Sequence, residues 1–261
     1  MSTSVHRIIE NLNKVISYSN DKDIYDGVKK DLSLSQNQND FNAEIKEILR
    51  DLKSSVHFDI GDLEHVRSSD KNLNSLPGLP FEKTYLETKY EGKTYGCLFK
   101  FDGDLLVAKL FRDNLGHMIY TGLTVMYEQS EIGVKRIFDT DLWGDERDDS
   151  NEDDCLEIDG FVMCLHIMNC SNIEYVDHPP MRIMNEKRKK KGKQPLFTYK
   201  TLHIKSDKKL CRKAESKGNR QSPRAHLRRG HIRKLKTHSV WVQPCYVKGE
   251  GGFVHKDYAF N

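Results

Sequence analysis

The sequence has no long apolar run, no leader of the signal-peptide type and no CxxC cysteine pair. No stretch approaches the roughly 18 apolar residues that a membrane-spanning helix requires, and residues 1–6 contain no apolar segment. Its six cysteines are spread over 261 residues, and a chain of this length does not need disulfides to hold a core. We therefore expect reduced thiols, a cytoplasmic location and no membrane partner.

A metal site is poorly supported by the spacing of the candidate ligands. Cys164, His166 and Cys170 are close in sequence, but residues 161–168 alternate in the manner of a strand. Cys164 and His166 would then share a face, whereas Cys170 would lie past the end of the strand. Because free cysteine is among the most buried residue types, structural cysteines are favoured over a metal clip. We predict no metal and no cofactor.

Apolar residues recur at helical spacing twice in the first sixty residues. One stripe consists of Val5, Ile8, Ile9, Leu12, Val15 and Ile16, and the other of Ile45, Ile48, Leu49, Leu52 and Val56. Residues 34–40 between them are polar and unpatterned, which predicts a loop. The pattern indicates an N-terminal helical region over residues 1–66 and a polar linker over 67–78. The helical pair could pack on the next domain or form a homo-oligomer with another copy of the chain.

From residue 79 the pattern changes from helical to extended. Residues 84–90 and 94–101 predict a β-hairpin, and 105–111 and 118–127 continue an antiparallel meander. Further strands are predicted at 161–168, 173–176 and 195–204. A helix is predicted to begin after Pro180 and to end at Gly192. The predicted fold is therefore α+β, with an N-terminal helical pair followed by a mainly antiparallel β domain, residues 79–261, that contains one or two helices.

Residues 139–159 carry eleven Asp or Glu against one basic residue. Such a block predicts a solvated loop, because its charges repel one another and little in it can be buried. Its acids lack the spacing and central glycine of an EF-hand, which argues against a calcium site. An alternative hypothesis is that this acidic loop covers a basic region and competes with nucleic acid.

The net charge of +3 hides a strong asymmetry along the chain. Residues 182–236 contain 21 Lys or Arg against three acids, an excess of 18, so the rest of the chain sums to −15. A basic segment of this kind attracts phosphates through the release of counterions. Residues 222–236 are rich in arginine, whose guanidinium binds phosphate oxygens bidentately, and Leu227, Ile232 and Leu235 would anchor the segment to the body. The predicted nucleic-acid contacts are Lys187, Arg188, Lys189, Lys190, Arg224, Arg228, Arg229, Arg233 and Lys234.

Two histidines, His226 and His231, lie among these arginines. Such a pair could serve as general base and general acid in phosphodiester transfer, with Arg228 or Arg229 stabilising the transition state. A metal-independent ribonuclease is therefore one alternative function. The other interpretation is structural hydrogen bonding, since no third orienting group or metal motif accompanies the pair. Trp241 is predicted to lie in the core.

Several segments together resemble a known family. They are residues 79–81, 85–87, 169–173, 191–199, the run Ser-Pro-Arg-Ala-His-Leu-Arg-Arg-Gly-His-Ile-Arg at 222–233, Val-Trp-Val at 240–242, and His-Lys-Asp-Tyr at 255–258. This combination is similar to a family of uncharacterised proteins of tailed phages and prophages. The resemblance covers residues 79–261 and implies a phage origin, one domain over those residues and an infected host cell as the location. It implies no catalytic activity.

The resemblance and the charge asymmetry together predict a phage protein that binds RNA or DNA in nucleic-acid transactions or in host takeover. A further alternative is a protein that inhibits a host defence complex or polymerase by protein–protein contact. In that case the acidic loop would mimic nucleic acid and the N-terminal helices would be the docking face.

Overall fold

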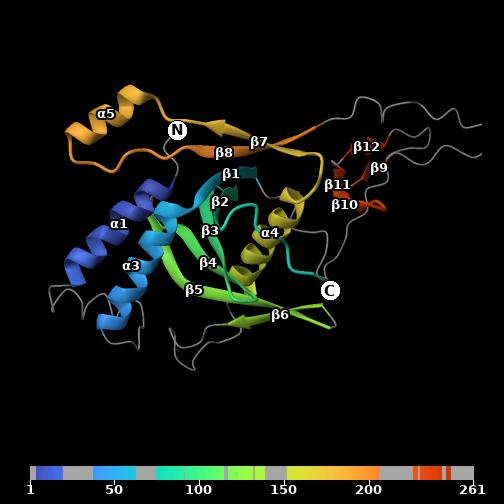
Figure 1. Ribbon diagram of the computed structural model, residues 1–261, viewed down its shortest axis with the longest axis horizontal. Coiled ribbons are helices and arrows are strands. Elements are labelled where there is room, and N and C mark those ends of the chain that lie inside the picture. Colours follow the sequence, from blue (N-terminus) through green and yellow to red (C-terminus); the bar gives the residue numbers. More distant parts are fainter. Residues whose placement is uncertain are drawn as a thin grey trace, which may run out of the picture.

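The computed structural model describes residues 4–19, 38–62, 75–90, 92–114, 117–131, 133–138, 152–205, 226–228, 230–242 and 245–247 (Figure 1). The elements of the first half are α1 (Ser4–Ser19), α3 (Gln38–Ser54), β1 (Val56–Asp62), β2 (Lys83–Tyr90), β3 (Lys93–Asp102), β4 (Leu105–Asn114), β5 (His117–Ser130) and β6 (Gly133–Phe138). Those of the second half are α4 (Glu152–Met168), β7 (Ile173–His178), α5 (Arg182–Lys190), β8 (Tyr199–Ile204), β9 (His226–Arg228), β10 (His231–Lys234), β11 (Ser239–Val242) and β12 (Cys245–Val247).

Eight strands form one mixed sheet in the order β6-β5-β4-β3-β2-β1-β8-β7. Strand β1 runs parallel to both of its neighbours, β2 and β8, and the other pairs in this sheet are antiparallel. Two hairpin turns of the meander use glycines with positive φ, Gly92 at +76° and Gly103 at +58°, a region that glycine enters without steric cost. The predicted antiparallel meander and the α+β class are confirmed.

Helices cover both faces of the sheet (Figure 1). On one face, the apolar stripes of α1 and α3 pack against Tyr85, Leu98 and Phe111. On the other face, α4 packs against residues that include Leu86 and Phe99. Successive strand residues point to opposite faces, which is why neighbours such as Leu98 and Phe99 serve different layers. Since their stripes are buried against the sheet, α1 and α3 follow the first of the two predicted arrangements, packing on the next part of the chain.

The strand predicted at 161–168 is wrong, because this segment is the second half of helix α4. Seven of its eight residues are buried, so the helix is apolar on all sides there and has no amphipathic period to distinguish it from a strand.

Residues 152–159 of the predicted acidic loop also belong to α4. Asp159 accepts a hydrogen bond from buried Tyr127 (3.0 Å) and pairs with Arg136 (3.2 Å). Residues 139–151 lie outside the described residues.

The cysteines of the candidate metal clip, Cys164 and Cys170, do not lie on and just past a strand at 161–168, as the sequence predicted. Cys164 and Cys170 are both buried free thiols, as expected for structural cysteines, and burial raises the pKa of Cys164 to about 12. Cys170 lies two residues past the end of α4, and its Sγ donates to the carbonyl oxygen of His166 in the last turn of that helix, at 3.7 Å. The thiols therefore belong to the packing of the C-terminal end of α4.

The boundary between α3 and β1 also differs from the prediction. Residues 38–40, predicted as loop, begin α3, and Val56, predicted on its apolar stripe, begins β1. The side chains of Ser54 and Ser55 end the helix by donating to carbonyl oxygens of its last turn. Buried His57 adds a contact from Nε2 to the Leu52 carbonyl oxygen at 2.9 Å. The chain then enters the middle of the sheet as a strand. The strand predicted at 195–204 is shorter, since β8 begins at Tyr199.

Ion pairs join α3 to the sheet beneath it. Asp51, only 2% exposed, contacts the Nζ atoms of Lys83 at 2.8 Å and Lys100 at 2.9 Å. Lys100 also pairs with Glu47, and Lys109 with Glu44 at 3.1 Å. Burial would raise the pKa of Asp51, but the hydrogen bonds from the two lysines outweigh it and hold that pKa below its ordinary value. These carboxylates fix which side of α3 faces the sheet.

Replacing Asp51 with Asn should lower the free energy of unfolding at pH 7 by about 2 kcal/mol, because two partly buried lysines each lose an ion-pair partner. The lowered pKa means that this stabilisation is present above the ordinary carboxylate pKa and is lost as the pH falls through the folded value. Urea denaturation of both proteins measures the difference. Asp104→Asn, at an exposed turn position, is the matched control and should leave the midpoint unchanged.

A second buried polar group is His57, whose ring packs edge-on against Tyr85 (5.8 Å) and Phe197 (5.0 Å). Burial lowers its pKa to about 4, so the imidazole is neutral at pH 7 and its Nε2–H donates to the Leu52 carbonyl. Within the described part of the chain, its Nδ1 has no hydrogen-bond partner. Protonation of Nδ1 would therefore place a positive charge among apolar side chains.

The buried His57 should make the fold sensitive to mild acid. The unfolded imidazole takes up a proton near pH 6.5 but the folded one only near pH 4, so stability is complete above pH 6.5 and falls between these values. Between pH 7 and pH 5 this amounts to about 2 kcal/mol. Wild type should lose more stability than His57→Gln over that interval in urea denaturation. Equal losses in the two proteins would contradict this role of His57.

Candidate nucleic-acid interface

The predicted basic helix is present as α5, which follows Pro180 and Met181. The chain leaves the helix at Gly192, whose φ of +64° suits glycine, and the predicted end is confirmed. None of the residues of α5 is buried. In Figure 1 this helix, in orange, stands at one end of the ribbon formed by β7 and β8, the last two strands at one edge of the sheet.

Two side chains of α5 hold the helix to the chain that follows it. Asn185 donates from Nδ2 to the Leu196 carbonyl oxygen (3.1 Å) and accepts from the Leu196 N–H at Oδ1 (2.7 Å). Arg188 donates from Nε to the Gln194 carbonyl oxygen (2.7 Å) and from Nη2 to Glu10 of α1 (3.1 Å). The Arg188 guanidinium, predicted to contact nucleic acid, thus already has two partners within the chain. Nothing in the sequence pattern marks Asn185 for this role, because its partner is a backbone group across a turn.

The remaining cations of α5 point to solvent. Lys187, Lys189 and Lys190 are exposed, and Lys191 and Lys193 continue the series beyond the helix. Within the described ranges none of these five has an ion-pair partner, while the one acid of the helix, Glu186, pairs with Arg182 (2.9 Å). Like charges so close together produce a strong local positive potential, which only a polyanion or dissolved counterions can offset.

The arginine-rich segment is divided between two small sheets. His226 and Arg228 lie on β9, which pairs with β12, whereas His231, Arg233 and Lys234 lie on β10, which pairs with β11. The two histidines predicted as an acid–base pair are therefore in different sheets. Arg224 and Arg229 lie outside the described residues. Arg233 and Lys234 are exposed.

The β10–β11 hairpin is attached to the end of α4. Trp241 is 7% exposed and packs with Ile232 against apolar residues of α4, which confirms its predicted place in a core. Asn172 binds the Trp241 backbone twice, at 2.9 and 2.8 Å. Ile232 anchors the segment as predicted. Leu235 does not, since it is 41% exposed after the strand has ended.

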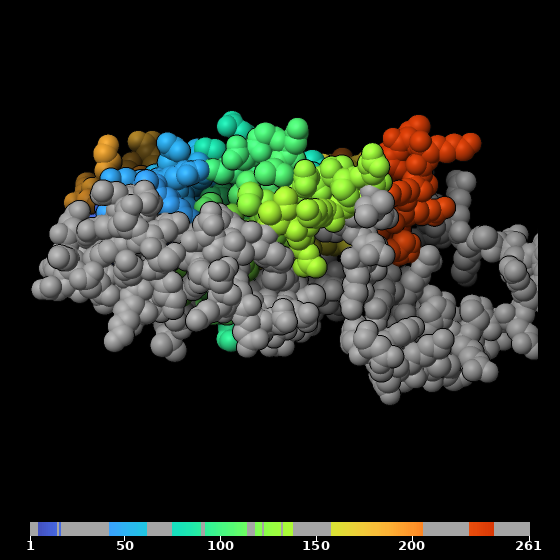
Figure 2. Space-filling view, turned by 90° about the horizontal axis from the view of Figure 1, so that it is seen from below, coloured from blue at the N-terminus to red at the C-terminus, as the bar shows by residue number. Residues whose placement is uncertain are grey.

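The two basic elements lie at opposite ends of the β7–β8 ribbon. Ile173 pairs with Ile204 near the β10–β11 hairpin, and His178 pairs with Tyr199 at the α5 end. Figures 1 and 2 show α5 and the small sheets at the two ends of the long axis. The basic residues of 182–236 thus form two separate cationic surfaces, although they are close in sequence.

Three further findings concern metal ligands, membrane spans and relatives of the chain. Over the described ranges, no group of three or more His, Cys, Asp or Glu is placed to hold a metal ion. None of the helices in those ranges is long and apolar enough to cross a membrane. Comparison with protein-family models, curated proteins and solved structures finds no match to this chain. The resemblance to tailed-phage proteins therefore stays a prediction.

Substituting Arg188 with Gln should loosen α5 without unfolding the sheet, because two charge-assisted hydrogen bonds are lost. The two lost hydrogen bonds should remove about 1.5 kcal/mol or more of the stabilisation of α5. Hydrogen exchange of the Leu196 amide should therefore become roughly tenfold faster or more. Arg182→Gln, which removes an exposed ion pair on the same helix, is the control and should have little effect. Unchanged exchange at Leu196 in Arg188→Gln would show that Arg188 does not hold the helix.

Proposed function

We propose that the protein binds nucleic acid through the phosphate backbone, with the exposed lysines of α5 as the principal contacts. The observation that carries this proposal is the set Lys187, Lys189 and Lys190, which are exposed and unpaired within the described ranges on a helix held in place by Asn185 and Arg188. A held helix presents its charges without the cost of ordering a free segment. Neutralising phosphates with these cations would release counterions and favour binding.

The chemistry of these side chains favours positioning over sequence readout. A lysine ammonium is a flexible point charge that contacts phosphate oxygens without reading base edges. The exposed apolar residues beside it, Met181 (74% exposed) and Ile183 (65%), could contact sugars or unstacked bases. Arg233 and Lys234 on β10 would add a second, separate contact. We therefore propose weak sequence preference and strong salt dependence.

The biological setting is part of the same proposal. The resemblance of residues 79–261 supports a phage protein that acts in the cytoplasm of an infected cell, in nucleic-acid transactions or in takeover of the host. A backbone-binding surface of low sequence preference would suit either role, because both require contact with nucleic acid of many sequences.

Fluorescence anisotropy with labelled RNA, single-stranded DNA and duplex DNA at two salt concentrations tests the proposal. The Lys187→Gln/Lys189→Gln/Lys190→Gln protein should bind its preferred nucleic acid at least tenfold more weakly at low salt. The slope of log affinity against log salt should become shallower by up to about 3.

The matched control is Lys89→Gln/Lys93→Gln/Lys135→Gln, which removes the same charge from exposed positions of the meander and β6. Its affinity should stay close to that of wild type. Absence of wild-type binding to all three nucleic acids, or equal losses in both triple variants, would refute the proposal.

A further inference from the structure

A groove lies between α1 and α3, apart from α5 and from the small sheets. It has a volume of about 500 Å³. Asn13 and Ile16 line it from α1, and Lys46, Leu49, Arg50, Lys53 and Ser54 line it from α3. Three of these seven described lining residues are cations and none of the seven is an acid. The described lining of the groove is therefore positive.

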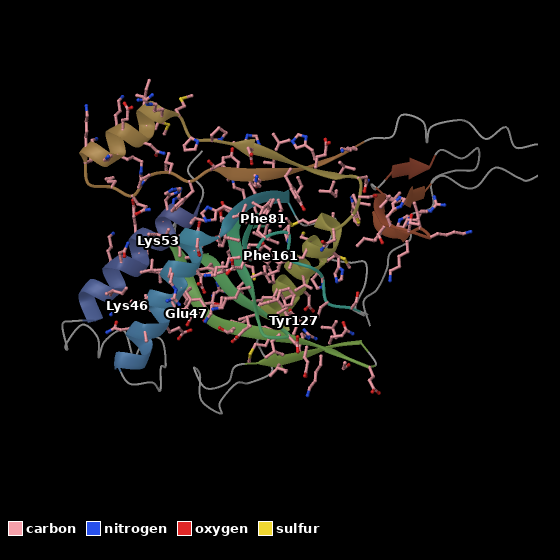
Figure 3. All side chains as sticks on the ribbon, viewed as in Figure 1. Lys46, Glu47, Lys53, Phe81, Tyr127 and Phe161 are labelled. Carbon is pink, nitrogen blue, oxygen red and sulfur yellow. The ribbon has the colours of Figure 1, made fainter. Side chains whose placement is uncertain are left out.

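Helix α3 separates its charges by sign. Three of its acids, Glu44, Glu47 and Asp51, face the sheet, where each pairs with a lysine. Its cations Lys46, Arg50 and Lys53 recur at helical spacing on the side that borders the groove. Figure 3 shows Lys46 and Lys53 on the α1 side of α3 and Glu47 on the side of the sheet.

The three groove cations are available for a ligand. All three are exposed, and no hydrogen bond or ion pair joins their side chains to any other residue of the described ranges. The helix carbonyls nearest to them already have donors. Ser54 Oγ donates to the carbonyl oxygens of Arg50 (3.0 Å) and Asp51 (3.2 Å). The negative end of the helix dipole is thus partly satisfied and opposes an anion less than a bare terminus would.

We propose that this α1–α3 groove is a further binding site for nucleic-acid phosphates, beyond α5 and β10, an inference that rests on the proposed function and adds a site to it. The Arg50 guanidinium can bind one phosphate bidentately, flanked by the two lysines, and Asn13 and Ser54 supply neutral hydrogen-bond donors. Lys46 and Lys53 are about 10 Å apart along the helix axis. That distance is about the rise over three phosphate-to-phosphate steps on one strand of B-DNA.

The position of the groove relative to α5 supports a shared ligand. Glu10 of α1 pairs with Arg188 of α5, so the helix that forms one wall of the groove also touches the base of α5. Figures 1 and 2 show α5 and α3 at the same end of the molecule, opposite the small sheets. Among the described residues that line the groove none is aromatic, and two, Ile16 and Leu49, are apolar. This composition fits a phosphate backbone better than a protein partner, whose binding usually relies on buried aromatic anchors.

The test is the salt dependence of nucleic-acid affinity for Lys46→Gln/Arg50→Gln/Lys53→Gln. At low salt its affinity should fall at least tenfold, and the slope of log affinity against log salt should become shallower by up to about 3. The substituted side chains are exposed, so the urea midpoint should match that of wild type. Lys89→Gln/Lys93→Gln/Lys135→Gln again controls for net charge. In wild type, hydrogen exchange over residues 46–54 should slow when the oligonucleotide is added.

The outcomes separate this inference from the proposed function. If the groove variant binds like wild type while the α5 variant does not, the groove inference is wrong and the proposed function stands. If wild type binds no nucleic acid, the proposed function is wrong and the inference fails with it. If polyglutamate displaces the oligonucleotide equally well at the same charge concentration, the groove takes acidic protein surfaces and the phosphate assignment is overturned.

Discussion

The structure depends on the ion pairs between α3 and the sheet. Asp51 lies between Lys83 and Lys100, and neighbouring turns of the helix add Glu47 and Glu44. Apolar packing alone would tolerate small rotations of a helix, because it has no directional preference. Charge pairs do not tolerate such rotations, since each rotation separates a partly buried carboxylate from its lysine. The rotation of α3 about its axis is therefore set by electrostatics as well as by its apolar stripe.

The orientation of α3 has a consequence on its other side. Once Glu44, Glu47 and Asp51 are directed to the sheet, the cations face outward, and the described residues that line the groove between α3 and α1 include no acid. At α5 the arrangement is similar in kind, since Arg188 and Asn185 are engaged with the chain and the neighbouring lysines remain free within the described ranges. In both places some polar side chains fix an element so that others are presented to solvent. A surface built in this way is suited to a long anionic ligand that gains from several weak contacts at once.

The sequence predicted those parts of the fold whose local pattern agrees with their environment. Helices α1 and α3 each bury one stripe and the meander alternates between two covered faces, so their periods are visible in the sequence. The second half of α4 is buried on all sides, and a uniformly apolar run has no period to read. Val56 fits the spacing of the preceding helix, and only the capping contacts of Ser54 and Ser55 show where that helix ends. The local sequence pattern does not show that a helix is buried on all sides, nor where a helix ends, when contacts with other parts of the structure determine both.

The candidate site was predicted in part for a related reason. A cation run such as Lys187–Lys190 is evident from composition alone, whereas the separation of α5 from Arg233 depends on the length of the β7–β8 ribbon. The groove cations were not predicted, although a signal exists. Lys46, Arg50 and Lys53 oppose Glu44, Glu47 and Asp51 on a helical projection, and the charges of an amphipathic helix can be sorted by face as its apolar residues are.

The most direct test is the salt dependence of wild-type affinity for whichever of RNA, single-stranded DNA and duplex DNA the protein binds most tightly. If the three exposed lysines of α5 and the three groove cations all contact phosphates, the slope of log affinity against log salt should be about −5 for a duplex and about −4 for a single strand. A slope shallower than about −1 would mean that these cations do not act together on one polyanion. That result would contradict the claim that the charges of this end of the molecule are arranged for nucleic acid.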